Sequence, residues 1–192
     1  MTTKDISKYF GDYIVRQIEK DDASDYFRLV KSNAGRLAEF FPNTVPANRD
    51  PGASKAFISN CIKSRKKKEF DCFITRSSRE GEIVGVVFLK NFDWKARKCE
   101  LSYFVDGEHE KMGIASGSVM VILKYCFDEL ELTRIIARAA VYNLASRRVL
   151  EKNGFVLEGT LRQDYKTFAG KWIDLAYYGL LKKDFCLESE SR

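Results

Sequence analysis

The segment Glu110-Lys-Met-Gly-Ile-Ala-Ser-Gly117 decides the fold, because it joins a predicted strand to a predicted helix through a glycine. The strand is expected at residues 99–105, and the helix at residues 116–130 is apolar on almost every side, as buried helices are. Gly113 permits a tight bend, and the small residues that follow leave the backbone accessible. Because the first amides of a helix have no partner within it, a diphosphate would fit here. An ordinary strand-to-helix turn explains this segment equally well when it is taken alone.

The segment Asn143-Leu-Ala-Ser-Arg-Arg-Val-Leu-Glu-Lys-Asn-Gly-Phe155 predicts a second helix, which its Asn-Gly pair terminates. Asn143, Ser146 and Arg147 are three and four residues apart, so they share one face of that helix. An amide, a hydroxyl and a cation are thereby brought together. The alternative is purely structural: Asn143 then only caps the helix, and Ser146 is an ordinary surface residue.

The rest of the chain predicts an α+β (mixed α/β) fold. Alternating apolar residues indicate strands, and apolar residues three or four apart indicate helices. Strands are expected at residues 13–18, 70–75, 83–92, 99–105, 133–141, 155–165 and 171–182. Helices are expected at residues 22–30, 37–41, 51–68, 116–130 and 144–152. The order of strand, helices, three antiparallel strands, helix, strand, helix and two strands predicts a mixed sheet with helices packed on it.

Composition fits one domain over residues 1–192, with a core at about residues 13–185 and short flexible termini. Apolar residues make up 45% of the chain and charged residues 31%, which is typical of globular proteins. The first residues lack the apolar core of a signal peptide, so we expect a cytoplasmic protein without membrane attachment. Five cysteines without a close pair argue against disulfides and zinc, and the single histidine, His109, argues against a Ser-His or Cys-His centre. We therefore expect no metal.

The net charge of +6 favours anionic partners, which include nucleic acid and a phosphate-rich cofactor. A basic run at residues 63–68 ends a predicted helix, where cations are favoured in any case. The run lacks interleaved aromatic residues that could stack on bases, so nucleic acid is not the expected substrate. Binding of RNA or a ribosome through this run is the alternative.

The two segments together, in this order and spacing, resemble the GNAT superfamily of N-acetyltransferases, and in particular its RimJ/RimL-type branch. Gly113 and Ala115 match the Q/R-x-x-G-x-G/A signature of that family, while Glu110 stands where Gln or Arg is usual. The resemblance is continuous from about residue 83 to residue 185. Its other matching motifs are Asn143-x-x-Ser146, Glu151-Lys-Asn-Gly-Phe155, Glu158-Gly-x-Leu-Arg162 and Gly170-Lys-Trp-x-Asp174.

The resemblance implies a sheet of about seven strands, mostly antiparallel, with splayed central parallel strands and four or five flanking helices. It also implies acetyl-CoA as co-substrate. The pantetheine arm would lie between the strands at residues 99–105 and 133–141 and pair with the backbone near Phe104 and Val105. The remaining expected cofactor-binding residues are Lys111, Met112, Gly113, Ile114, Ala115, Ser116, Asn143, Ser146 and Arg147.

The same resemblance suggests the catalytic groups for direct attack within a ternary complex. Glu100, on one strand face with Ser102 and Phe104, is the first choice of base, although an ion-paired glutamate would look the same. Asp164 or Tyr165 is the second choice. Ser146 is the candidate acid for the departing thiolate, with Tyr177 or Tyr178 as alternatives.

The acceptor is expected to be a primary amine, and the resemblance favours a protein N-terminus, such as that of a ribosomal protein. A polyamine or antibiotic acceptor is the alternative within the enzyme class. A module that binds CoA without transferring acetyl is the alternative outside it, and Glu110 in the phosphate loop favours that reading. A homodimer through the aromatic C-terminal strands is also left open, since core packing explains those residues equally well.

Overall fold

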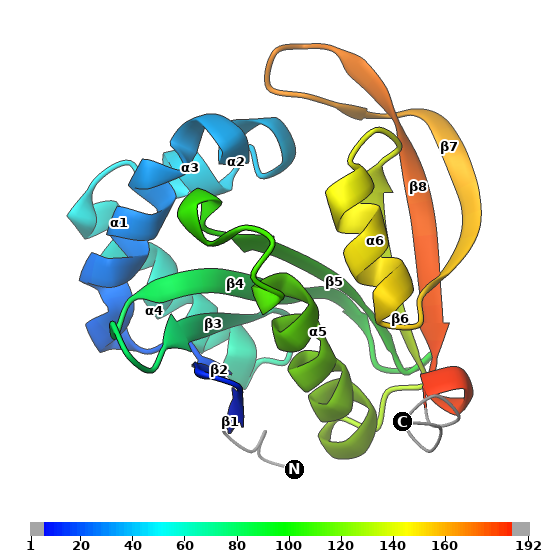
Figure 1. The fold of residues 1–192 in the computed structure, drawn as a ribbon, viewed down its shortest axis with the longest axis horizontal. Helices are drawn as coiled ribbons and strands as arrows, with labels where there is room; N and C mark the ends of the chain where they lie inside the picture. The colour runs from blue at the N-terminus through cyan, green and yellow to red at the C-terminus, as the bar shows by residue number, and fades with distance from the viewer. Residues whose placement is uncertain (1–5, 186–192) are drawn as a thin grey trace.

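The computed structural model describes residues 6–185, which form one mixed sheet with helices on both faces (Figure 1). The order of the eight strands across the sheet is β1-β2-β3-β4-β5-β6-β8-β7. The strands are β1 (Ser7–Phe10), β2 (Tyr13–Gln17), β3 (Asp71–Ser77), β4 (Ile83–Asp93), β5 (Lys98–Val105), β6 (Arg134–Ala140), β7 (Val156–Lys166) and β8 (Trp172–Leu181). The α-helices are α1 (Ala23–Ser32), α2 (Ala34–Phe40), α3 (Thr44–Ala47), α4 (Pro51–Lys66), α5 (Ile114–Lys124) and α6 (Leu144–Lys152). The predicted fold class is therefore confirmed.

Local sequence signals account for the ends of several helices. Asp50 accepts a hydrogen bond from the Ala53 amide at 2.8 Å, and Pro51 occupies the first turn of α4, so this helix begins where predicted. Asn143 caps α6 by accepting from the Ser146 amide at 3.0 Å. Helix α5 begins at Ile114, two residues before the predicted start.

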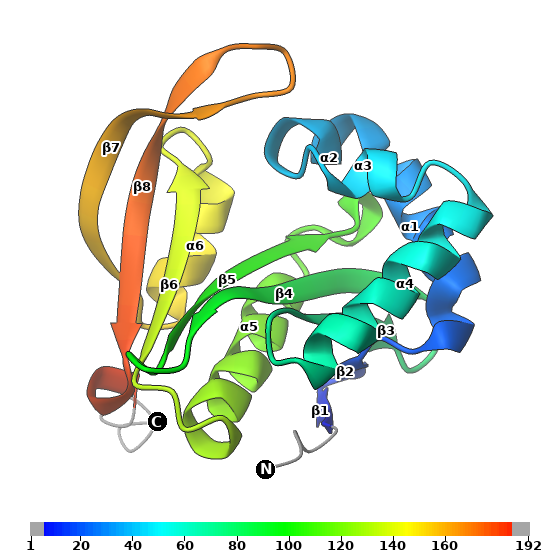
Figure 2. The ribbon, with the colours of Figure 1, turned by 180° about the vertical axis from the view of Figure 1, so that it is seen from behind.

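The helices divide the core into two parts. Helices α5 and α6 cover one face of the sheet, and α4 covers the other, as the two opposite views show (Figures 1 and 2). Under α5 and α6, the buried side chains include Leu101, Ile122 and Leu150. Under α1 and α4, they include Tyr26 and Ile58, packed against strands β3 and β4.

Among the strands and α-helices, two short elements escaped the sequence prediction. Strand β1 has four mostly exposed residues and no alternation that would reveal a strand. Its Phe10 ring packs directly on α5, where a Cβ at Gly117 would overlap it, so Gly117 allows this close approach. Helix α3 is a single turn that follows Pro42. The prediction of flexible termini falls largely on residues 1–5 and 186–192, which lie outside the described part of the chain.

The sheet parts at its centre. Strands β5 and β6 are the one parallel pair among the described strands. They pair over four residues only, with Lys98–Leu101 of β5 beside Arg134–Ala137 of β6. Strand β5 continues to pair with β4 as far as Val105, and β6 continues with β8 as far as Ala140. The ends of β5 and β6 therefore diverge, which confirms the predicted splay.

None of the helices within residues 6–185 combines the length and the apolar character that crossing a membrane requires. The four described cysteines, Cys61, Cys72, Cys99 and Cys126, are buried free thiols. Cys186 lies outside the described residues.

Candidate active site

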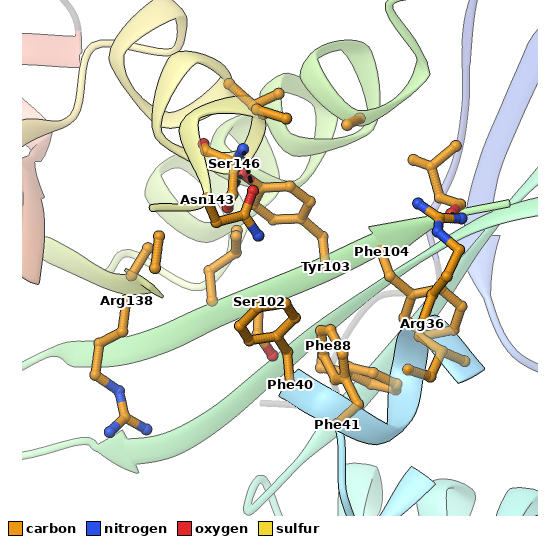
Figure 3. Close-up of a pocket in the computed structure, with 18 of the residues that line it drawn as sticks. Arg36, Phe40, Phe41, Phe88, Ser102, Tyr103, Phe104, Arg138, Asn143 and Ser146 are labelled. Atoms are coloured by element: carbon orange, nitrogen blue, oxygen red, sulfur yellow. Dashed lines mark hydrogen bonds between the residues drawn. The ribbon is translucent and has the colours of Figure 1, made fainter. Parts of the chain in front are cut away.

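A cavity of about 1030 Å³ opens where β5 and β6 diverge (Figure 3). The ends of both strands form its centre, with residues 102–105 on one side and residues 138–140 on the other. The N-terminal turns of α5 and α6 line one end of the cavity. Residues of α2 and α3 line the other end. The cavity therefore connects the two faces of the sheet.

The start of α5 has the geometry of an anion site. Gly113 precedes the helix in the left-handed conformation, with φ 80° and ψ −1°. The amide of Gly117 donates to the Gly113 carbonyl at 2.9 Å, so the three amides before it have no acceptor within the helix. A Cβ at Gly113 would meet no atom within 4 Å, which leaves the space beside these amides open. An anion can therefore approach the backbone closely here.

Five of the six residues expected along this loop line the cavity, and one does not. Those that line it are Lys111, Gly113, Ile114, Ala115 and Ser116. The side chain of Met112 lies outside the cavity formed by the described residues, and Met112 is 57% exposed.

Glu110 is neutralised by an arginine from a distant part of the chain. Its carboxylate forms an ion pair with Arg36 of α2, and both side chains line the cavity. Arg36 also donates to the Asn33 side chain at 3.0 Å, which in turn donates to Asp106 at 2.7 Å. The junction of α1 and α2 is thus fastened to the loop that leads into α5. Sequence spacing could not reveal this pair, because Arg36 and Glu110 are 74 residues apart.

Ser146 shares its hydrogen bonds with Tyr103, a residue that the sequence reasoning missed. The Tyr103 hydroxyl lies 3.0 Å from the Ser146 hydroxyl and donates to the Ser146 carbonyl at 2.9 Å (Figure 3). Burial raises the pKa of Tyr103 well above its ordinary value, although the bond to Ser146 lowers it in part. The alternation of β5 turns this side chain away from Glu100 and toward α6. The sequence signal that could have revealed Tyr103 was a tyrosine on the strand face opposite Glu100.

Helix α6 presents a different arginine to the cavity from the one expected. Asn143, Ser146, Arg148 and Lys152 line the cavity. The Arg147 guanidinium instead donates to the Tyr178 hydroxyl at 2.9 Å and to the Val141 carbonyl at 3.1 Å. Tyr178, one alternative acid, is buried in the core beneath α6, away from the cavity that the described residues line.

Glu100 lines the cavity as a fully paired carboxylate. Its Oε1 accepts from Arg138 Nη2 at 2.9 Å and lies 3.3 Å from the Lys90 ammonium. Its Oε2 accepts from the side-chain amide of Asn91 at 2.9 Å. Burial raises the pKa of Glu100, but Lys90 and Arg138 outweigh burial, so the pKa lies below its ordinary value. Glu100 is therefore ionised and a weak base.

The second pair of candidate bases is separated by the geometry. Tyr165 lines the cavity, and its hydroxyl is buried without a hydrogen-bond partner among the described residues. Burial raises the pKa of Tyr165. Asp164 lies outside the lining, accepts from the Tyr177 hydroxyl at 2.7 Å, and is 4.0 Å from Arg138. Tyr177, the other alternative acid, is thus engaged with Asp164.

Comparison with known proteins agrees with this geometry. Residues 13–156 match the family model described as an acetyltransferase (GNAT) domain. The chain is 31% identical over 175 residues to the "Putative ribosomal N-acetyltransferase YdaF" of Bacillus subtilis, which covers 89% of this chain and 92% of that protein.

Solved structures agree as well. The ribosomal-protein-S5-alanine acetyltransferase of Vibrio fischeri superposes with a TM-score of 0.87 at 26% identity, over 94% of this chain and 99% of that one. RimJ of Mycobacterium smegmatis, solved in complex with CoA-disulfide, shares the fold, with a TM-score of 0.79 at 22% identity, over 89% of this chain and 82% of that one. GNAT acetyltransferases use acetyl-CoA. The chain therefore belongs to the GNAT family of N-acetyltransferases, among relatives of the RimJ/RimL type.

Proposed function

We propose that this enzyme transfers acetyl from acetyl-CoA to the N-terminal α-amine of a protein in the cytoplasm, with a ribosomal protein as the expected acceptor. The observation that carries the proposal is the cavity, which runs from the anion site at α5, between the parted strands, to the face under α2. Donor and acceptor can meet there directly, so no covalent enzyme intermediate is needed. The names of the relatives support a protein acceptor.

The donor end offers the groups that a CoA thioester needs. The free amides that precede Gly117 would hold the diphosphate, and the backbone of Phe104 and Val105 would pair with the pantetheine arm. Arg148 and Lys152, rather than Arg147, are in position to meet the remaining phosphate. When bound, acetyl-CoA supplies the activated acetyl group. The Arg36 ion pair supports this assignment, because it offsets the charge of Glu110, the feature that favoured a catalytically inactive CoA-binding module.

Ser146 would donate a proton to the departing thiolate. Its hydroxyl faces the cavity, and its contact with Tyr103 fixes the orientation of that hydroxyl. Because the pKa of Tyr103 is raised, the phenol stays protonated at neutral pH and remains a hydrogen-bond donor to the Ser146 carbonyl. Tyr103 is therefore a positioning residue in this mechanism.

A protein α-amine has a pKa of about 8, so roughly a fifth of it is already neutral at physiological pH and a weak base suffices. Glu100 remains our first candidate for the proton acceptor, because its carboxylate lies in the cavity on the same strand face as Ser102. Tyr165 is the second candidate, since its side chain also lines the cavity and its hydroxyl has no hydrogen-bond partner among the described residues. Loss of activity in Glu100→Gln but not in Tyr165→Phe would favour the first assignment.

A thiol-release assay with acetyl-CoA tests the proposal. One peptide should carry a free N-terminus, a second should have that terminus blocked but contain lysine, and spermidine should serve as the polyamine. We expect turnover with the first peptide and little with the other two acceptors. Mass spectrometry of cellular protein N-termini, with and without the enzyme, would then identify the acceptor. Turnover with spermidine alone would overturn the proposal.

A further inference from the structure

Phenylalanine rings line the acceptor end of the cavity. We call the part of the cavity lined by Phe40, Phe41, Phe88 and Phe104 the phenyl branch. The ring centroid of Phe41 lies 5.4 Å from that of Phe104, in an edge-on arrangement, and 6.2 Å from that of Phe88, so these three rings form a continuous wall (Figure 3). These rings come from the C-terminal end of α2, from β4 and from β5, which are far apart in the sequence. Phe40 and Phe41 are partly exposed, whereas Phe88 and Phe104 are buried behind them at 5% and 8% exposure.

The phenyl branch begins beside the place where the two substrates meet. Phe88 of β4 lies directly opposite Ser102 of β5 in the antiparallel register. Ser102 lines the cavity at the divergence of β5 and β6, and its hydroxyl is buried without a hydrogen-bond partner among the described residues. A group bound next to Ser102 would therefore have the phenyl wall beside it, while the Ser102 hydroxyl itself stays buried.

The charges around the cavity disfavour acceptors that carry several ammonium groups. The carboxylates among the described lining residues are Glu39, Glu100 and Glu110, and each already has a partner. Glu100 is paired with Arg138, Glu110 with Arg36, and Glu39 accepts from the Tyr142 hydroxyl at 2.6 Å. Among the described lining residues, six arginine and lysine side chains outnumber these three carboxylates, and only Glu39, whose partner is an uncharged phenol, has no cation beside it. A second ammonium would therefore lose water on entering a cavity of net positive charge, which is costly.

We propose that the acceptor is a peptide with a single reacting α-amine and a large apolar side chain at its first or second residue, held in the phenyl branch. This inference rests on the proposed function, since it names the kind of N-terminus that the same site selects. An apolar side chain would displace water from the rings of Phe40 and Phe41, which are partly exposed, and gain contact area there. A short polar side chain would leave that wall wet.

Competition between peptides on the unmodified enzyme tests the inference without any variant. Two panels of otherwise identical peptides would carry Leu, Phe, Ser or Asp at position one or at position two. We expect kcat/KM for the Leu or Phe peptide to exceed that of the Ser peptide by about 10-fold or more in one panel, which is within the range that apolar pockets achieve. Equal rates across both panels would overturn the inference while leaving the proposed function intact. Failure to acetylate any peptide would overturn both.

Matched variants identify the pocket responsible. Phe41→Ser should reduce the preference for apolar peptides to about 3-fold or less, whereas Phe41→Leu should keep most of it because the wall stays apolar. Tyr9→Ser serves as the control, since Tyr9 is 70% exposed on β1 and lies outside the cavity lining. An unchanged preference in folded Phe41→Ser would place the apolar contact elsewhere and contradict the inference.

Discussion

Replacing Gly113 by alanine should have two separable effects: backbone strain should lower the stability of the protein, and the added methyl group should weaken the binding of CoA. Gly113 has φ 80°, a conformation that costs an L-residue about 1–2 kcal/mol. A Cβ there would meet no protein atom within 4 Å, so strain is the whole expected effect on stability. For a protein of this size, the melting temperature should fall by about 2–8 °C.

The effect on CoA binding should be separate and larger. The added methyl group would occupy the open space beside the first amides of α5, where the diphosphate is expected to lie. Losing one charge-assisted hydrogen bond costs about 1.5–3 kcal/mol, which corresponds to a rise in Kd of roughly 10- to 150-fold. Isothermal titration calorimetry with CoA measures this change directly.

Gly81 provides a matched control for the strain term. It has φ 71°, and a Cβ there would also meet no atom within 4 Å, but Gly81 lies outside the cavity lining. Gly81→Ala should therefore lower the free energy of unfolding about as much as Gly113→Ala does, with CoA affinity unchanged. If the two variants bound CoA equally well, the assignment of the diphosphate to the start of α5 would be refuted.

Three further predictions concern the proton donor, the ion pair and the paired glutamate. Ser146→Ala should lower kcat about 10- to 100-fold with little change in the Kd for CoA. Adding Tyr103→Phe should lower kcat no further, because Tyr103 acts through Ser146. Additive losses of kcat in stopped-flow turnover would contradict this. Arg36→Ala should weaken CoA binding several-fold by exposing the Glu110 charge, and Glu110→Gln in the same chain should restore binding in calorimetry; no restoration would mean that Arg36 acts otherwise. Because the pKa of Glu100 is lowered in the folded state, its stabilising contribution is present above the unfolded carboxyl pKa of about 4.3 and is lost as pH falls through the lower folded value. In urea titrations, the difference in unfolding free energy between the wild type and Glu100→Gln should therefore shrink on acidification. A difference that grew would mean that folding raises the pKa of Glu100 instead of lowering it.

Local chemistry explains which parts of the molecule were predictable. The glycine before α5 and the Asn143 cap on α6 depend on neighbouring residues, so the sequence pattern was enough to locate both. The side of a helix that faces a cavity depends on how the helix is rotated against the sheet. Spacing placed Asn143, Ser146 and Arg147 on one face, yet packing turns Arg147 toward Tyr178.

Contacts between distant segments were the part that the sequence could not supply. The ion pair between Arg36 and Glu110 joins residues 74 positions apart, and no periodicity encodes such a contact. The partner of Ser146 was missed for a related reason, since Tyr103 meets it only because β5 and α6 lie next to each other in space. The sequence left ion pairing of Glu100 open as an alternative, and that pairing also depends on a distant residue, Arg138 of β6.

The early end of the pairing between β5 and β6 has a consequence for how freely this site can change during evolution. Beyond Leu101 and Ala137 the main chains on either side of the gap have no neighbouring strand across it, so a guest molecule would complete the sheet much as an extra strand does. Main-chain atoms are the same whatever side chain they carry. Recognition through the backbone would tolerate change in the surrounding side chains, including an acidic residue in the phosphate loop, as long as a partner such as Arg36 offsets its charge.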